Sequence, residues 1–161
     1  MRLQILKIIK LHQAIEAIRS RTDLNKKFSY ALIKTKAQIQ SIFDAVAEME
    51  KLPPEIQEFE KERIEAARRF AKRKDNGDID ADGVVIRLDN PQAYNEAVES
   101  LRIKYNGAIV AHEKSQQEVA EYLKREDKVE VHKVPFDLFP DTISPEILEA
   151  LEPMIEERKD D

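Results

Sequence analysis

The sequence predicts a mostly α-helical protein with a small β element, and three observations support this fold class. The chain of 161 residues contains only 3 glycines and 7 prolines, which are too few for a sandwich or barrel with many turns. Charged residues make up 37% of the chain and the mean hydropathy is −0.57, as in proteins with much exposed helix surface. A heptad spacing of apolar residues also runs through 94–122. The length suits one domain with a modest core.

The first 51 residues predict two helices. Apolar residues recur at steps of three and four through 5–18, which places them on one helical face. "TDLN" predicts a break, and 28–51 forms a second helix with Leu32, Ile39 and Phe43 on its apolar stripe. The opening "MRLQIL" alternates polar and apolar residues, so it fits either a short strand or the start of the first helix.

A third helix is predicted to follow "KLPPEI" and to end near Lys74, with Ile64 on its apolar stripe. Two prolines disturb the preceding helix but suit the first turn of a new one. The turn "KDNGDIDADG" ends this helix, and β-branched "VVIRL" at 84–88 predicts a short strand.

One long helix is predicted from Pro91 to about Arg125. Its heptad seam consists of nine residues at alternating steps of four and three: Tyr94, Val98, Leu101, Tyr105, Ala108, His112, Ser115, Val119 and Tyr122. "KVEVHKV" at 128–134 predicts a second strand, paired with 84–88. Ser144 and Pro145 then begin a short C-terminal helix.

These elements predict a long antiparallel helical hairpin or coiled coil, a small two- or three-stranded β element and a short C-terminal helix. We expect a single elongated domain over 1–161. Its parts are an N-terminal basic helix (1–27), the hairpin with a β turn at 75–90 (28–125), and a strand, helix and acidic tail (126–161). Because an elongated rod of two or three helices buries little apolar surface per residue, we expect the chain to complete its core by forming a homodimer.

In this layout the chain resembles a group of uncharacterised small coiled-coil bacteriophage proteins. The likeness rests on the long helical pair, the "KDNGDIDADG" turn, the strand "VEVHKV" and the ending "PFDLFPDTISPEILEALEPMIEE". The resemblance implies a phage or prophage source. It implies no enzyme chemistry and no transferable site.

The acidic turn partly matches a calcium-binding loop, which needs six to eight oxygen ligands around a tight turn. The matching positions are Asp78, Asp80, Asp82 and Gly83, with the Val84 carbonyl and Asp89 as further ligands. Ile86 offers no side-chain ligand, and the next helix starts late. A solvated turn whose aspartates bond backbone amides is the alternative, and we otherwise expect no cofactor.

The remaining polar residues do not form a catalytic motif. The absence of cysteine excludes disulfides, thiolate zinc sites and cysteine nucleophiles. His12, His112 and His132 fall on different elements without metal-ligand spacing, and His112 is expected to be a hydrogen-bonded seam residue. No serine has the context of a nucleophile, and the glycines cannot form a phosphate loop. We therefore expect a protein that is not an enzyme.

Binding to a host or phage protein is the function that the sequence favours, and one form of it is an inhibitor or adaptor of host machinery. The candidate contact residues are the apolar ones of the C-terminal part: Phe136, Leu138, Phe139, Leu148, Leu151 and Ile155. The alternative is that this segment packs back on the chain. A second alternative is a ligand- or nucleotide-sequestering oligomer with Arg68, Arg69 and Arg73 on a phosphate, although those arginines also suit a salt-bridged surface.

Charge distribution bears on nucleic acid as a third alternative. Residues 1–36 hold nine Lys/Arg and two Asp/Glu, and the rest of the chain is strongly acidic, for a net charge of −5. Nucleic-acid binding is therefore not favoured, whereas the basic segment suits an acidic partner or the chain's own acidic end. No long apolar run or signal peptide is evident, so we expect a cytoplasmic protein, in the host cell if phage-encoded.

Overall fold

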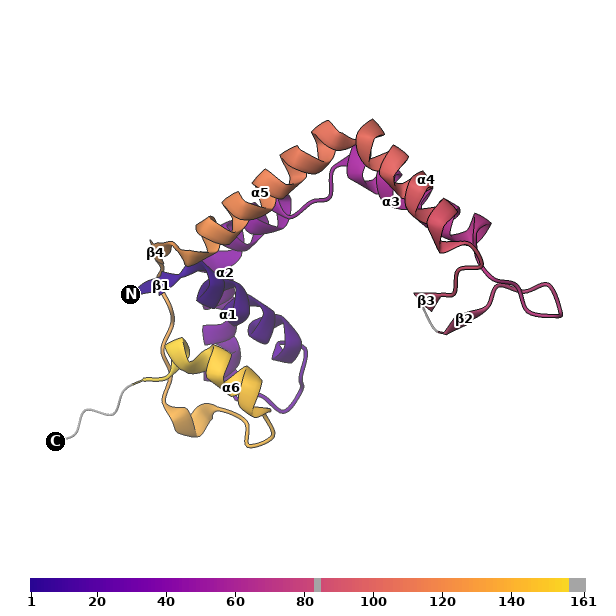
Figure 1. Cartoon of the computed structure of the whole chain (residues 1–161). Coiled ribbons are helices and arrows are strands. Elements are labelled where there is room, and N and C mark those ends of the chain that lie inside the picture. The colour runs from indigo at the N-terminus through magenta and orange to yellow at the C-terminus, as the bar shows by residue number, and fades with distance from the viewer. Residues whose placement is uncertain (83–84, 157–161) are drawn as a thin grey trace. The chain divides into compact units, whose positions relative to one another are not determined.

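The computed structural model describes residues 1–82 and 85–156, and within these ranges it contains six α-helices and four short strands. The prediction of a mostly α protein with a small β element is confirmed. The chain divides into two compact units. Unit 1 comprises Met1–Glu50 and Glu118–Asp161, and unit 2 comprises Lys51–Gln117 (Figure 1). Within the described ranges, no helix is both long and apolar enough to cross a membrane.

Unit 1 is built on three helices, α1 (Ile5–Ile18), α2 (Lys26–Met49) and α6 (Pro145–Leu151). Local sequence sets where two of them begin: the Asn25 side chain accepts the Lys27 amide, and that of Ser144 accepts the Ile147 amide. Their apolar faces meet in one core, whose most deeply buried members include Ile8, Leu11, Ile15, Phe28, Leu32, Ile39, Leu151 and Met154.

A short sheet joins the two chain segments that form unit 1. Strand β1 (Arg2–Gln4) pairs antiparallel with β4 (Glu126–Lys128), and Arg2 lies opposite Lys128. Both interpretations of the opening residues are correct, because the strand passes directly into α1. The chain stays extended after β4, and Val134 forms a parallel bridge with Ile155.

The predicted pairing of 84–88 with 128–134 is wrong. Strand β3 (Val85–Ile86) pairs instead with β2 (Ala81–Asp82), its neighbour in sequence, and β4 pairs with β1. A local hairpin closes a far shorter loop than the predicted pairing, so it loses less chain entropy. Gly83 and Val84 lie outside the described residues.

Unit 2 consists of α3 (Pro54–Arg69), the β2–β3 hairpin, α4 (Pro91–Lys104) and the first part of α5 (Asn106–Lys124). Helix α3 ends before the predicted Lys74 because the chain beyond it is extended and bonded to the hairpin: the Lys72 amide donates to the Arg87 carbonyl at 2.8 Å. Helices α3 and α4 lie antiparallel, since Glu62 contacts Tyr105 whereas Phe70 accepts the amide of Asp89.

The predicted continuous helix after Pro91 is interrupted at Tyr105, which separates α4 from α5. Asn106 and Gly107 follow immediately and are poor helix formers. The Tyr105 hydroxyl also donates to Glu62 Oε1 at 2.7 Å, which ties this position to α3. The periodicity nevertheless identified the inward face, since Val119 is buried and the eight other seam residues are half-buried.

Candidate protein-binding surfaces

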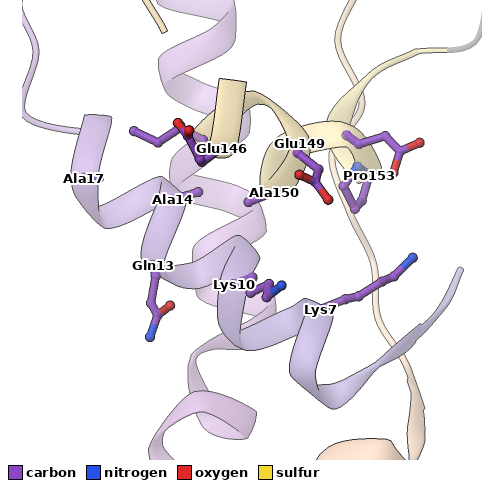
Figure 2. A pocket seen from close by; sticks show the side chains of 11 residues that line it. Lys7, Lys10, Gln13, Ala14, Ala17, Glu146, Glu149, Ala150 and Pro153 are labelled. Atoms are coloured by element: carbon purple, nitrogen blue, oxygen red, sulfur yellow. The ribbon is translucent and has the colours of Figure 1, made fainter. Parts of the chain in front are cut away.

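A groove lies on unit 1 between α1 and α6, and we call it the α1–α6 groove (Figure 2). Its volume is about 510 Å³. The floor is made of small and apolar side chains, namely Ala14, Ala17, Ile147, Ala150 and Pro153. Gln13 adds an amide on the α1 side. Small residues at a helix surface let a further helix approach closely, within about 8–10 Å between axes.

Opposite charges line the two walls of this groove. Lys7 and Lys10 extend from α1, and three carboxylates, Glu146, Glu149 and Glu152, come from α6 and the turn after it. All five side chains are exposed, and none of them forms an ion pair with a described residue. The pKa of Glu146 lies below its usual range because a backbone amide and the Ser144 hydroxyl donate to its carboxylate at the start of α6.

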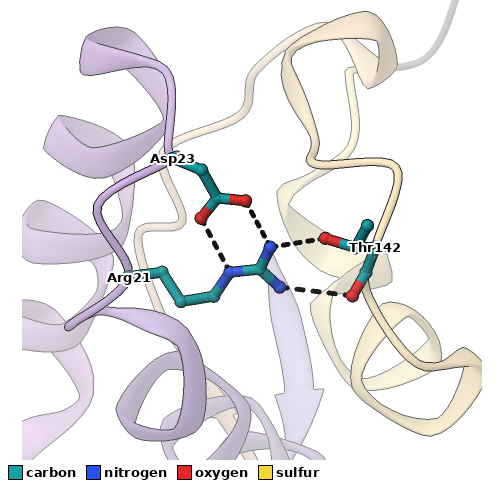
Figure 3. A network of polar contacts seen from close by, with 3 residues as sticks. All are labelled: Arg21, Asp23 and Thr142. Carbon is teal, nitrogen blue, oxygen red and sulfur yellow. Dashed lines mark hydrogen bonds and ion pairs between the residues drawn. The ribbon is translucent and has the colours of Figure 1, made fainter.

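A polar clamp holds the chain before α6 against the end of α1 (Figure 3). The Arg21 Nε donates to Asp23 Oδ1 at 2.9 Å, and its Nη1 donates to the Thr142 carbonyl at 3.2 Å. The hydrogen bond to Asp23 raises the pKa of Arg21, and the same bond lowers the pKa of Asp23. The clamp thus ties the segment that leads to Ser144, where α6 begins, to the chain just after α1.

Unit 2 carries a second surface, the α4–α5 face, which we define as Phe59, Ile103, Asn106 and Ile109, which line one hollow, together with the exposed Val110 that follows Ile109. A shallow hollow of about 650 Å³ opens on it, with Glu99, Arg102 and Glu113 on the rim. Ile103 is 72% exposed and Val110 56% exposed, which is unusual for large aliphatic side chains. The Phe59 ring packs edge-on against Tyr105 at 5.9 Å, so the floor of the hollow is held in place.

The sequence singled out the C-terminal apolar residues as partner contacts, and the structure divides them into two groups. Leu151 and Phe139 are buried in the core of unit 1, where the Phe139 ring lies 4.6 Å from Phe28. These two side chains are not accessible while unit 1 is folded. Leu138, Leu148 and Ile155 are half-buried against the same core. Phe136 is 53% exposed and stacks on Phe139 at the edge of a small hollow.

The three arginines considered for phosphate binding are all exposed and do not converge. Arg68 and Arg69 lie in the last turn of α3. Arg73 lies on the extended segment after it and donates to the Gly77 carbonyl at 2.9 Å. These positions fit the alternative of a solvated surface, because the Arg73 guanidinium already bonds the backbone of the turn and the other two side chains are exposed.

The acidic turn forms a hairpin rather than a loop wrapped around a central point. Asp82 pairs with Val85 in the β2–β3 ladder, Asp78 accepts from Asn76, and Asp80 lies 3.5 Å from Arg87. Asp89 donates its amide to Phe70, at the far end of the hairpin. Among the described residues no three carboxylate or imidazole side chains converge to hold a metal ion.

The histidines occupy three separate environments. His12 is buried, stacks on Phe43 with 3.8 Å between ring centroids, and places Nε2 3.0 Å from Gln40 Oε1. His112 contacts the amide of Gln116, one turn further along α5. His132 lies edge-on to the exposed ring of Tyr30. Each histidine therefore contacts a different neighbour within its own part of the fold.

Both surfaces were missed at the level of the sequence. The α1–α6 groove joins residues about 140 positions apart, and no local spacing indicates such a neighbour. The α4–α5 face did leave a signal: Ile103 and Val110 are seven residues apart and lie off the heptad seam, so the helix is apolar on a second side.

Comparison of the chain with protein-family models, with curated proteins and with solved structures finds no match in any of the three. The features of the chain that bear on its function are therefore the surfaces described above.

Proposed function

We propose that the protein acts by binding another protein, as an inhibitor or adaptor and not as an enzyme, and that the α4–α5 face is its binding surface. One observation carries the proposal. The described residues of unit 2 expose more large apolar side chains than they bury. The exposed ones are Leu52, Ile64, Val85, Ile103 and Val110, whereas the buried hydrophobic residues are Ile56, Ala66 and Ala71.

The energetics of these side chains favour contact with a partner. Fully burying one isoleucine or valine contributes about 1.5–3 kcal/mol relative to leaving it in water. Ile103 and Val110 are both exposed and are seven residues apart, about two helical turns, on either side of the interruption at Tyr105, so a single helix laid along this face would cover both. This is the geometry of helix-in-groove recognition, in which apolar anchors recur every three or four residues.

The charged residues on the rim of the hollow indicate which side chains a partner would carry. Glu99 and Glu113 flank the apolar centre at either end, and Arg102 lies beside Ile103. We therefore expect a partner helix with aliphatic anchors in its centre and basic residues toward both ends. A phage source, which the resemblance implies, would make a host protein the natural partner.

Site-specific photo-crosslinking in bacterial cells tests this proposal. A benzophenone amino acid is placed at Asn106, in the hollow, and in a parallel variant at Ala111, which is exposed on another side of the same helix. We expect a discrete adduct with another protein from position 106 and none from 111.

A second substitution, Ile103→Asp, then disrupts the face without disturbing the fold, because the side chain is mostly exposed. The adduct is expected to fall at least about tenfold, equivalent to about 1.4 kcal/mol of binding. Ala111→Asp is the matched control and should leave it unchanged. The proposal fails if no discrete adduct forms, if the adduct is only with another copy of this chain, or if Ile103→Asp leaves it intact.

A further inference from the structure

We infer that the α1–α6 groove is the contact surface for a second copy of this chain, related by a two-fold axis. The inference concerns unit 1 and does not depend on the α4–α5 face. It begins with the charges of the groove. Two lysines on one wall and three glutamates on the other face the same opening and lie outside every ion pair of the described residues.

A two-fold axis through the groove brings each wall against the opposite wall of the other copy. In such an isologous contact one patch meets itself, so a patch with a basic and an acidic side is self-complementary. Lys7 and Lys10 of one copy would lie along Glu149 and Glu152 of the other, twice per dimer. An unrelated protein would need to carry this charge pattern independently, whereas a second copy carries it necessarily.

The floor of the groove permits the close approach that this contact requires. Ala14, Ala17 and Ala150 project no further than a methyl group, so α1 of one copy can lie in the groove of the other. The α1–α6 pair of one copy then packs face to face on the α1–α6 pair of the other. Gln13, on the exposed side of α1, would lie near the axis and face its own counterpart.

The size of the patch sets the expected strength of association. Helix α1 has 14 residues and α6 has 7, so they are about 21 and 10 Å long. The contact is therefore smaller than the roughly 800 Å² per partner of a standard stable interface. We expect a weak, rapidly exchanging dimer that dissociates as salt is raised, because its ion pairs lie at the surface.

Charge reversal and mixing provide the test, with sedimentation velocity as the measurement over a range of protein concentration. The acidic variant is Lys7→Glu with Lys10→Glu, and the basic variant is Glu149→Lys with Glu152→Lys. We expect each variant alone to associate at least about tenfold more weakly than the wild type, and the equimolar mixture to form a dimer containing one copy of each.

The control variant is Lys26→Glu with Lys27→Glu, which makes the same change in charge on exposed positions of α2 and should leave association unchanged. A second measurement avoids charge altogether. Because the chain has no cysteine, Gln13→Cys introduces a single thiol, which should form a disulfide-linked dimer on mild oxidation, whereas Ser41→Cys on an exposed part of α2 should not.

Three results overturn the inference: a wild type that stays monomeric at all concentrations, reversals that do not weaken association, or a mixture that fails to restore it. Each result leaves the crosslinking experiment on unit 2 unaffected, so the two proposals succeed or fail separately.

Discussion

Thr35 is a polar side chain that is completely buried in unit 1, and it shows how one hydroxyl connects distant parts of the chain. Its Oγ1 accepts the backbone N–H of His132 at 3.0 Å, which joins α2 to the extended segment after β4. A buried amide without a partner costs about 1–3 kcal/mol. This bond therefore fixes the segment that leads to Phe139 and α6.

We predict that Thr35→Val, which keeps the shape and removes the acceptor, lowers the free energy of unfolding by about 1–3 kcal/mol. Chemical denaturation measures the loss. Hydrogen exchange at the His132 amide locates it, because the amide should exchange faster in Thr35→Val but stay protected in Thr35→Ser, which keeps the hydroxyl. Unchanged protection in the valine variant would show that this bond does not hold the segment.

At the same scale, the sequence identified which residues face inward but not what they contact. His12 follows Ile8 by four residues and precedes Ile15 by three, so the periodicity of 5–18 predicts that it shares their face, and the side chain is buried. Its partner Gln40 lies on α2, 28 residues away, and no spacing within one helix predicts such a pair. Ile64 was wrongly assigned to the inward face of α3, since it is 45% exposed whereas Ala66 is buried; two residues of a helix differ by about 200° around its axis.

Among the elements, helix starts were predictable and strand partners were not. Asn90, Ser144 and the prolines after them are local signals, and both helices begin at these sites. Strand pairing depends on which segments meet in three dimensions, so a sequence shows strand character at 84–88 without showing its partner. The break at Tyr105 was only partly predictable. Gly107 is a local signal in the sequence, whereas the hydrogen bond from Tyr105 to Glu62 of α3 depends on the fold.

The antiparallel pair α3 and α4 is joined by one carboxylate. Glu62 Oε1 accepts from Lys104 Nζ at 2.6 Å and from the Tyr105 hydroxyl at 2.7 Å. The hydrogen bond from Lys104, and then that from Tyr105, lowers the pKa of Glu62 below its ordinary value. The same carboxylate raises the pKa of both donors.

The sign of the pH dependence follows from this shift. Because the pKa of Glu62 is lower in the folded chain, its contribution to stability is present above the unfolded value of about 4.3 and is lost as pH falls through the folded value. We predict that Glu62→Gln melts at a lower temperature than the wild type at neutral pH, and that the difference vanishes in acid. Circular dichroism melts over pH measure this. Glu65→Gln, on the exposed side of α3, is the control, and a pH-independent difference would contradict the prediction.

At the scale of the whole molecule, the two units differ in how many large apolar side chains they bury. Unit 1 closes a core in which eight large apolar side chains have under 2% exposure. The described residues of unit 2 bury Ile56, Ala66 and Ala71, and polar contacts add to this packing: Glu62 bonds Lys104 and Tyr105, and backbone bonds join the β2–β3 hairpin to the end of α3. Local stability tracks the number of buried apolar contacts, so it should be unequal along the chain.

Hydrogen exchange followed by mass spectrometry of proteolytic fragments tests this inequality. We predict that amides of α1 and α2 exchange slowly, by global unfolding, and that amides of α4 exchange much faster, by local opening, because no described residue of α4 is fully buried. Helix α5 should show a gradient, slower around buried Val119 than around exposed Val110. A partner bound to the α4–α5 face should slow exchange in α4. Equal exchange rates in α1 and α4 of the free protein would contradict the prediction that unit 2 is less stable locally than unit 1.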